Sequence, residues 1–340
     1  MTVYAQFFCS IADLIADAQA SGVDETRMMQ AIREASEYVQ KKIGWFVPVT
    51  LSLSFPGTGT DRMFVPPLLA ITSITNDGTA LTSADYFLTP KNGYWANGPY
   101  DQVVRDPDSS LLAVWNPEKN AVVIAGRWGK YERSASTGAT VQDAPQSNSQ
   151  TTLKVSNGGL VSPGMVLLVE SEQEAVTGWE SPTTNVTLLD GAITATDDVL
   201  TLDDGTLVNT GEILRLDFEQ VRVKDKRSNQ VHVTRGWNNT GQVSHADNTQ
   251  VDVYRTVTVT RGVNGTTAAS HAQNTAIDRY YAPDDIQYLT KQIATLIVSK
   301  AKSGYQGRTG DAELGTVFYH DVFTREIDQV RQQYMMFTTD

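Results

Sequence analysis

The sequence has little of what disulfide bonding, secretion or membrane insertion requires. Its 340 residues include one cysteine, Cys9, so no internal disulfide can form. No stretch approaches the roughly 18–20 consecutive apolar residues that cross a bilayer. The first residues also lack the basic start of a secretory signal. We therefore expect a protein that is made in the cytoplasm and has no membrane partner.

Positive charge is scarce as well. The formal net charge is −12 and the isoelectric point lies near 4.8, the wrong sign for a protein that grips DNA through its phosphates. Residues 151–252 supply most of the excess, with 15 acidic and 7 basic side chains. Two interpretations stay open: the charge serves solubility, or it keeps a surface from binding DNA that passes nearby.

Catalytic motifs are missing. The sequence contains no Walker-type glycine-rich loop, GxSxG, HExxH or CxxC, so no nucleophile, base and orienting group can be assembled. We predict no enzyme activity and no cofactor.

Metal-binding patterns are weak too. His245 and His271 occupy equivalent positions of a repeat, but neither has a second histidine or a carboxylate at ligand spacing. Structural hydrogen bonds are therefore expected for both, and no metal. The run Asp203-Asp204-Gly205 lacks the spacing of a calcium loop and predicts a tight hairpin turn.

Helical patterns stand at both ends of the chain. After Asp24 as N-cap, apolar residues recur on one face of a helix that Gly44 ends. Near the other end, Pro283 suits the first helical position and Asp284 the positive end of the helix dipole. Residues 45–131 show short apolar runs with turn residues, which predict β-hairpins. We expect the two apolar helical faces to cover each other.

The middle of the chain is repetitive. Leu153-Lys-Val155 and the residues after it recur 47 positions later, and VHVTRGWNNTGQVSHADNTQV at 231–251 recurs 26 positions later. Both repeated units are rich in valine and threonine, with glycines at turns, which predicts a small β-barrel or sandwich module that is partly duplicated. The small polar residues 134–150 before it are interpreted as a linker or an ordered surface loop.

Two glutamates are equivalent in these repeats. Glu172 and Glu219 each lie among apolar strand residues, and each could be buried against the arginine of an Arg-Gly turn. Those turns are Arg235-Gly236 and Arg261-Gly262. We interpret the pairs as structural and not as acid–base dyads.

These patterns predict an α+β fold. A helical body is formed by the N- and C-terminal helices plus a small β region, and it carries an inserted all-β module. The expected division is 1–133 for the N-terminal part, 134–150 for the linker, 151–277 for the insert, and 278–340 for the C-terminal helices that complete the body.

Several short pieces, taken in order, carry a resemblance to a known family. They are AIREAS at 31–36, IGWFVP at 43–48, FVPPLL at 64–69 leading to DYFL at 85–88, VIAGRWG at 123–129 with Gly126, Trp128 and Gly129, and APDDI at 282–286 with Pro283 and Asp284. The set resembles the head–tail connector (adaptor) proteins of long-tailed, lambda-like bacteriophages and covers about 1–131 and 278–340. The inserted repeats resemble a β-module of other phage tail and connector proteins.

The resemblance implies a structural ring protein in the neck of a virion. It implies a dodecamer of this chain on the phage portal protein, with a tail terminator or stopper below. Double-stranded DNA would pass through the channel without specific binding, and no cofactor or catalytic residue is implied. The apolar residues Tyr334, Met335, Met336 and Phe337 are predicted to bury against a neighbouring subunit or the portal. Packing within the subunit stays open.

Two other roles remain. One is a tail-side stopper or completion protein. The other is a carbohydrate-binding or host-attachment protein, suggested by the β-repeats and the six tryptophans, although scattered tryptophans more often serve core or interface packing.

Overall fold

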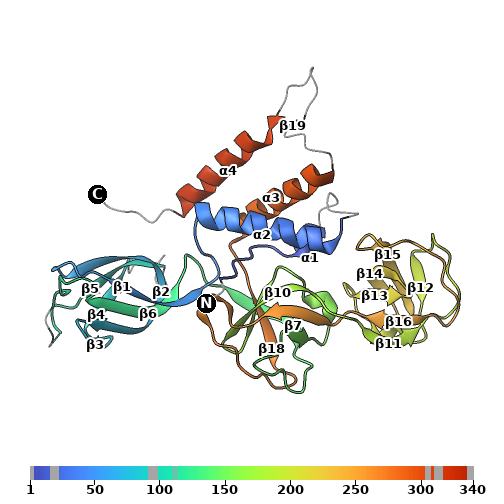
Figure 1. Cartoon of the computed structure of the whole chain (residues 1–340), viewed down its shortest axis with the longest axis horizontal. Coiled ribbons are helices and arrows are strands. Elements are labelled where there is room, and N and C mark those ends of the chain that lie inside the picture. The colour runs from blue at the N-terminus through green and yellow to red at the C-terminus, as the bar shows by residue number, and fades with distance from the viewer. Residues whose placement is uncertain are drawn as a thin grey trace.

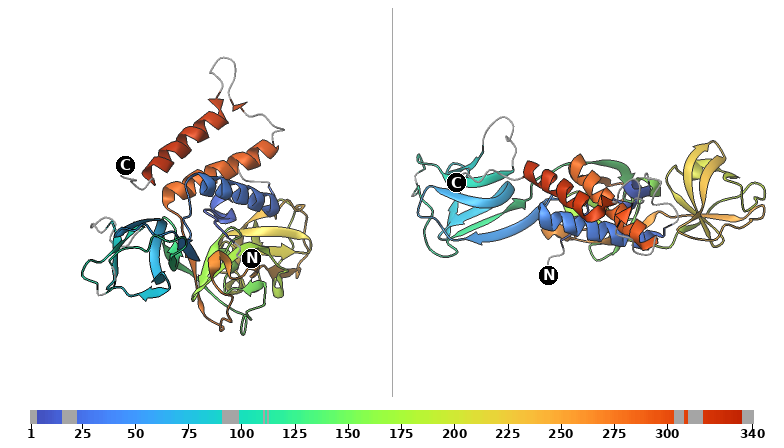
Figure 2. Two further views of the ribbon diagram at one scale, coloured as in Figure 1. Left: turned by 60° about the vertical axis from the view of Figure 1, so that its left-hand side comes forward. Right: turned by 90° about the horizontal axis from the view of Figure 1, so that it is seen from above.

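Three six-stranded antiparallel sheets lie in a row, and the helices stand on one side of it, above the central sheet (Figure 1). This computed structural model describes residues 4–15, 23–90, 99–109, 111, 113–302, 308–309 and 317–334. Side chains are described throughout these ranges except at 300–302, 308–309 and 317–324. Seen from above, the helices cross over the middle of the row (Figure 2).

The expected α+β class with a helical body is therefore wrong. Strands account for 40% of the chain and helices for 20%, so the protein is mainly β. The physical reason is that each β segment builds a core of its own, including residues 49–128, which were expected to form only a small β region. Within the described ranges, no helix is long and apolar enough to cross a membrane.

The helices form one unit, here called the helical cap. Its members are α1 (Ile11–Ile15), α2 (Glu25–Lys42), α3 (Asp284–Lys302) and α4 (Tyr319–Gln333). The Asp24 side chain caps α2 by accepting a hydrogen bond from the Arg27 amide, as its position before the apolar stripe predicts. Buried residues of α2, α3 and α4, among them Ile32, Leu289 and Ile327, share one core. The two ends of the chain therefore fold together.

Pro283 stands one residue before α3, and its carbonyl accepts a hydrogen bond from the Gln287 amide. Asp284 is the first helical residue, where its charge favours the positive end of the dipole.

The first β unit is the sheet of residues 49–128. Its strands are β1 (Val49–Phe55), β2 (Arg62–Asn76), β3 (Thr79–Leu81), β4 (Tyr86–Thr89), β5 (Tyr100–Arg105) and β6 (Val122–Trp128), in the order β1-β6-β2-β5-β4 with β3 on β2. Trp115 and Trp128 are fully buried in its core. The Trp128 indole donates a hydrogen bond to the Leu51 carbonyl, and the Gly129 amide donates one to the Pro67 carbonyl. The segment Gly126-Arg127-Trp128-Gly129 thus bonds to the chain of β1 and β2 on either side of β6.

The second and third β units are two copies of one fold. The second has β7 (Ser134–Thr140), β8 (Thr152–Lys154), β9 (Val166–Val169), β10 (Glu172–Trp179), β17 (Thr256–Thr260) and β18 (Ala276–Tyr280). The third has β11 (Thr183–Leu188), β12 (Val199–Thr201), β13 (Ile213–Leu216), β14 (Glu219–Arg227), β15 (Gln230–Trp237) and β16 (Gln250–Val253). Their strand orders, β7-β18-β9-β10-β17-β8 and β11-β16-β13-β14-β15-β12, match position by position.

The third unit is inserted into the second. It lies between β10 and β17, which pair with each other as β14 and β15 do in the third unit. This nesting explains why the sequence repeat has two different offsets: the part before the insertion and the part after it are displaced in opposite directions. One hairpin of the outer copy therefore opens to admit the whole inner copy.

Residues 134–150 differ from the linker that was expected. They begin with β7, which pairs with β18, and continue with bridges from Val141 to Val155 and from Gln146 to His271. The small polar residues misled the interpretation because β7 is an edge strand, of which only Ala139 is buried. The second unit thus begins at Ser134.

Replacing Gly126 with alanine should destabilise the first β unit. An added Cβ would lie 2.3 Å from the Ala70 carbonyl oxygen of the neighbouring strand, so the strands must move apart. We expect a loss of about 1–3 kcal/mol in the free energy of unfolding, the usual cost of overpacking. Urea denaturation of the full chain measures it. Gly178→Ala is the matched control, because nothing lies within 4 Å of its Cβ position; an equal loss there would contradict the argument.

Candidate functional site

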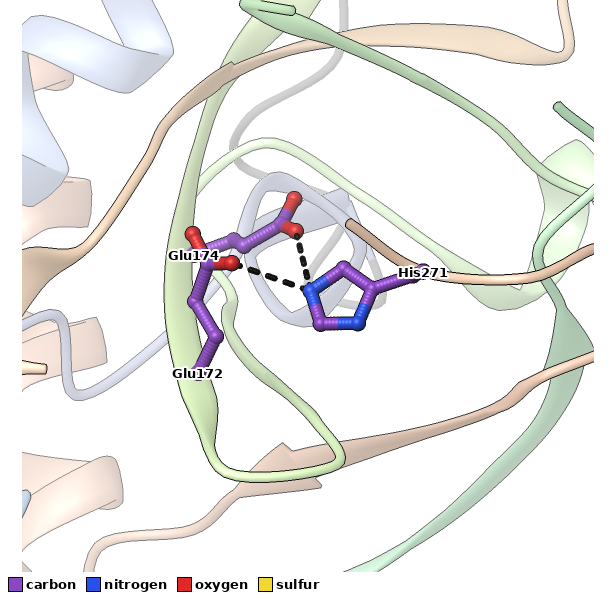
Figure 3. A group of neighbouring side chains, drawn as sticks. All are labelled: Glu172, Glu174 and His271. Carbon is purple, nitrogen blue, oxygen red and sulfur yellow. Dashed lines mark hydrogen bonds and ion pairs between the residues drawn. The ribbon is translucent and has the colours of Figure 1, made fainter. Parts of the chain in front are cut away.

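Each repeated unit buries one cluster of a glutamate, an arginine and a histidine. In the second unit these are Glu172 at the start of β10, Arg261 just after β17, and His271 on the bridge to Gln146. Figure 3 shows Glu172 and Glu174 side by side on β10, with both carboxylates facing the His271 ring. The third unit holds the equivalent Glu219, Arg235 and His245.

The carboxylate of each cluster is saturated with hydrogen bonds. Glu219 accepts from Arg235 Nε at 2.7 Å, Arg235 Nη2 at 2.8 Å, the Gly236 amide at 2.9 Å, the Val243 amide at 3.1 Å and His245 Nε2 at 3.0 Å. Glu172 accepts five equivalent bonds, from Arg261 Nε and Nη2, the Gly262 and Ala269 amides, and His271 Nε2. The repeats suggested these ion pairs, and the structure brings both together.

The arginines also hold the surrounding loops. Arg261 donates to the carbonyls of Ser147, Gln150 and Ala269. Arg235 donates to those of Thr194, Asp197 and Val243, the equivalent positions. Every N–H of each guanidinium therefore has a partner, and each cluster closes three chain segments around one buried charge pair.

Electrostatics agree with a structural role. Burial opposes ionisation of Glu219, but the hydrogen bonds from Arg235, Gly236 and His245 outweigh it and lower its pKa to about 2. The same balance lowers the pKa of Glu172. Both groups remain charged at neutral pH and are unsuited to exchanging a proton with a substrate.

The histidines bridge two carboxylates each, which the sequence analysis missed. His271 contacts the exposed Glu170 through Nδ1 at 2.8 Å and Glu172 through Nε2 at 2.9 Å. His245 makes the same pair of contacts with Asp217 and Glu219. These carboxylates are far away along the chain, so local spacing could not reveal them. The available signal was that acidic residues recur at equivalent positions before both glutamates.

The cluster of the second unit brings together three side chains of the types that bind metal ions. Ligand atoms of Glu172, Glu174 and His271 all lie within 4.8 Å of one another (Figure 3). However, Glu172 has no lone pair left, and the guanidinium of Arg261 already lies between the carboxylates, with Nε 3.1 Å from Glu174 Oε1. The carboxylate oxygens of this cluster therefore bind a guanidinium and are not free to bind a metal ion.

Of the carboxylates in the cluster of the second unit, Glu174 has no acidic counterpart in the third unit. Its equivalent in the third unit is Val221, and its neighbour Gln146 corresponds to Ile193. Glu174 is fully buried and receives only one hydrogen bond from a side chain, from Gln146 Nε2 at 3.3 Å. Burial, with a smaller contribution from the Glu172 charge, raises its pKa to about 7 against the attraction of Arg261. The second unit thus carries an excess buried acid that the third lacks.

The C-terminal interface residues have a mixed outcome. The Tyr334 ring meets Phe46 at a centroid distance of 5.0 Å, and its hydroxyl donates to Asp285 at 2.8 Å. Lys130 Nζ also donates to the Tyr334 carbonyl. Tyr334 therefore packs within its own subunit, the option that the sequence left open. Met335, Met336 and Phe337 lie outside the described residues.

The expected hairpin turn at Asp203-Asp204-Gly205 is wrong in type. Asp204 instead caps the 3-10 helix η3 (Gly205–Leu207), accepting a hydrogen bond from the Thr206 amide. Asn157 caps η2 (Gly158–Leu160) in the same way. Short polar side chains that cap and those that turn are the same residue types, which is why the pattern was ambiguous.

Comparison of this chain with protein-family models, with curated proteins and with solved structures found no match.

Replacing Glu174 with valine, the residue of the other copy, should stabilise the second unit above neutral pH. A raised pKa means that the folded unit binds the proton more tightly, so its stability is highest below about pH 4.5 and falls as pH rises to about 7. Glu174→Val removes that fall. Hydrogen exchange of β10 amides at pH 5 and pH 8, corrected for intrinsic rates, measures it. Val221→Glu should create the same fall in β14, and its absence would contradict the explanation.

Replacing Glu219 with glutamine should be severely destabilising. It leaves Arg235 buried without a counter-charge, a change that costs about 3–5 kcal/mol. Amide exchange in β14 and β15 would report the loss. Asp217→Asn tests the other carboxylate that contacts His245. The Asp217 side chain is 59% exposed, so the variant should change stability by less than about 1 kcal/mol. Equal effects of the two variants would refute the assignment of Glu219 as the central group.

Proposed function

We propose that this chain is a structural virion protein, the head–tail connector that docks on a phage portal and joins head to tail. One observation carries the proposal: the helices of the two chain ends share a single core, although 241 residues separate α2 from α3. Two segments of the family resemblance, AIREAS at 31–36 and APDDI at 282–286, lie in α2 and at the start of α3, while FVPPLL and VIAGRWG lie in β2 and β6 of the first β unit. The β copies are then an addition to these parts.

The surface of the helical cap supports subunit contacts. Tyr38 on α2 and Tyr288 on α3 are 40% and 58% exposed. Exposed aromatic side chains of this kind are enriched at protein interfaces. A contact between different faces of identical subunits closes into a ring when the rotation between them is right.

The buried clusters and the charge also favour a structural role. Both glutamate–arginine pairs are closed to substrates, since every donor and acceptor of the pair is used within the subunit. The net charge of −12 suits a channel that lets DNA pass without holding it.

Assembly tests the proposal. Mass photometry of the purified protein, alone and mixed with portal rings, should show a cyclic oligomer or a portal complex, and negative-stain images should show which end of the portal it caps. A protein that stays monomeric and never binds portal would reject the connector role. Binding only to the tail side would favour a stopper, and glycan binding by residues 134–281 would favour host attachment.

Deleting residues 335–340 should weaken portal binding without unfolding the cap. Tyr334 is kept because it packs on Phe46 and bonds Asp285, so its removal would damage the subunit itself. Co-sedimentation with portal rings measures the binding, and circular dichroism checks the fold. Tyr334→Phe is the control: it loses the hydroxyl bond inside the subunit and should bind portal normally. Unchanged co-sedimentation of the deletion variant would remove the C-terminal residues from the interface.

A further inference from the structure

Each β copy binds another part of the chain through an equivalent asparagine. Each Arg-Gly turn is followed by an asparagine in the left-handed conformation, Asn264 in the second unit and Asn238 in the third, both at φ +55°. Asn264 is fully buried and binds the backbone of Ala5 twice, accepting from its amide at 2.8 Å and donating to its carbonyl at 2.9 Å. Asn238 accepts from the Glu25 amide at 2.8 Å. An equivalent side chain thus captures a different backbone segment in each copy.

The third unit meets the helical cap at Glu25, the first residue of α2. Besides the bond from its amide to Asn238, the Glu25 carboxylate accepts from the Trp237 indole at 3.3 Å. The carboxylate is enclosed by Trp237 of β15 and Trp179 of β10. The titratable groups facing it are Arg222 of β14 and Tyr254. One acidic side chain therefore joins the cap, the second unit and the third unit.

A groove of about 900 Å³ runs beside this contact, between α2 and the two β units. Further charged residues line it, namely Arg33, Glu34, Glu37, Glu180 and Arg215. The third unit therefore does not lie flat against the cap, and Glu25 stands where the two surfaces touch.

The third unit is tethered by two chain crossings. One leads from β10 to β11 and the other from β16 to β17. Beside the second crossing, Arg255 pairs with Glu212 at 2.6 Å, and Glu212 accepts from the Gly158 amide at 3.1 Å. These bonds lie next to the tethers, so they would persist if the far side of the unit moved. The contact with Glu25 also lies near the crossings, because Trp179 is the last residue of β10 and Tyr254 stands between β16 and β17. Glu25 therefore holds the third unit to the cap at the place where the unit can turn.

We propose that Glu25 is a proton-operated latch, which holds the third β unit against the start of α2 when its carboxyl is protonated and releases the unit to swing on the two crossings when it is ionised.

Electrostatics give the direction of the switch. Burial raises the pKa of docked Glu25 to about 7, although Trp237, Arg222 and Trp179 act to lower it. A released Glu25 faces water and returns to its ordinary range. Docking is therefore strongest below about pH 4.5 and weakens as the pH rises to about 7. Above about pH 7 the docking equilibrium does not change further. The docking equilibrium should fall by about 300-fold across this window, close to tenfold per pH unit.

Fluorescence energy transfer measures docking directly. Labels on Lys41→Cys in α2 and Lys224→Cys in β14 report the distance between the cap and the third unit, and both native side chains are exposed. The native Cys9 is 1% exposed and burial raises its pKa, so it does not take label. The full-length protein should show high transfer at pH 5 and lower transfer at pH 8. Constant transfer over that range would overturn the proposal.

Three variants separate the latch from other titrating groups. Glu25→Gln should stay docked at every pH, while Asp328→Asn, which changes an exposed carboxylate of the cap on α4 away from the groove, should keep the wild-type profile. Asn238→Gly preserves the left-handed backbone but loses the bond to α2, so it should weaken docking at each pH and keep the slope. It also tests the hinge if the glutamine variant fails to fold. A wild-type profile in Glu25→Gln, or unchanged docking in Asn238→Gly, would overturn the latch.

Discussion

A buried carboxylate that must be fully hydrogen-bonded governs the architecture of both β copies. Removing an ionised glutamate from water costs far more than a typical domain can spare unless a counter-charge and several donors replace the solvent. Glu172 and Glu219 satisfy this requirement with an arginine, a histidine and two backbone amides each. The donors of each carboxylate lie in one stretch, 261–271 in the outer copy and 235–245 in the inner copy. Binding the glutamate therefore fixes the path of that loop against the strand that carries the carboxylate.

The same constraint explains how one copy tolerates the other inside it. The inner copy enters between β10 and β17, while the arginine and histidine of the outer copy follow after β17. The outer cluster is therefore completed by residues from both sides of the insertion. Closing it holds the split hairpin together, and Val176 of β10 packs in one hydrophobic core with Val257 and Val259 of β17. The inner copy needs no such help, since its strands are continuous.

Local features of the fold were predictable from the sequence, and long-range ones were less so. The apolar stripe of α2 and the cap at Asp24 follow from short-range spacing, and the equivalence of Glu172 and Glu219 follows from the repeat. The predicted fold class was wrong because the helices have a clear periodic pattern, whereas the short apolar runs at 49–128 did not show that they form one six-stranded sheet. The edge strand β7 had too few apolar residues to be recognised. Contacts of Glu174 with Gln146 and Arg261 depend on tertiary proximity, which no spacing in one chain encodes.

Nesting also dictates the order in which the parts can be completed during synthesis on a ribosome. Strands β11 to β16 leave the exit tunnel consecutively, so the inner copy has all its partners while the outer one still lacks β17 and β18. Domains fold as units once their sequence has emerged. The outer sheet closes next, and the helical cap waits for α3 and α4, which follow β18 in the chain. After the first β unit, which precedes both copies in the chain, the nested part is thus completed from its interior outwards, while α1 and α2 wait for α3 and α4.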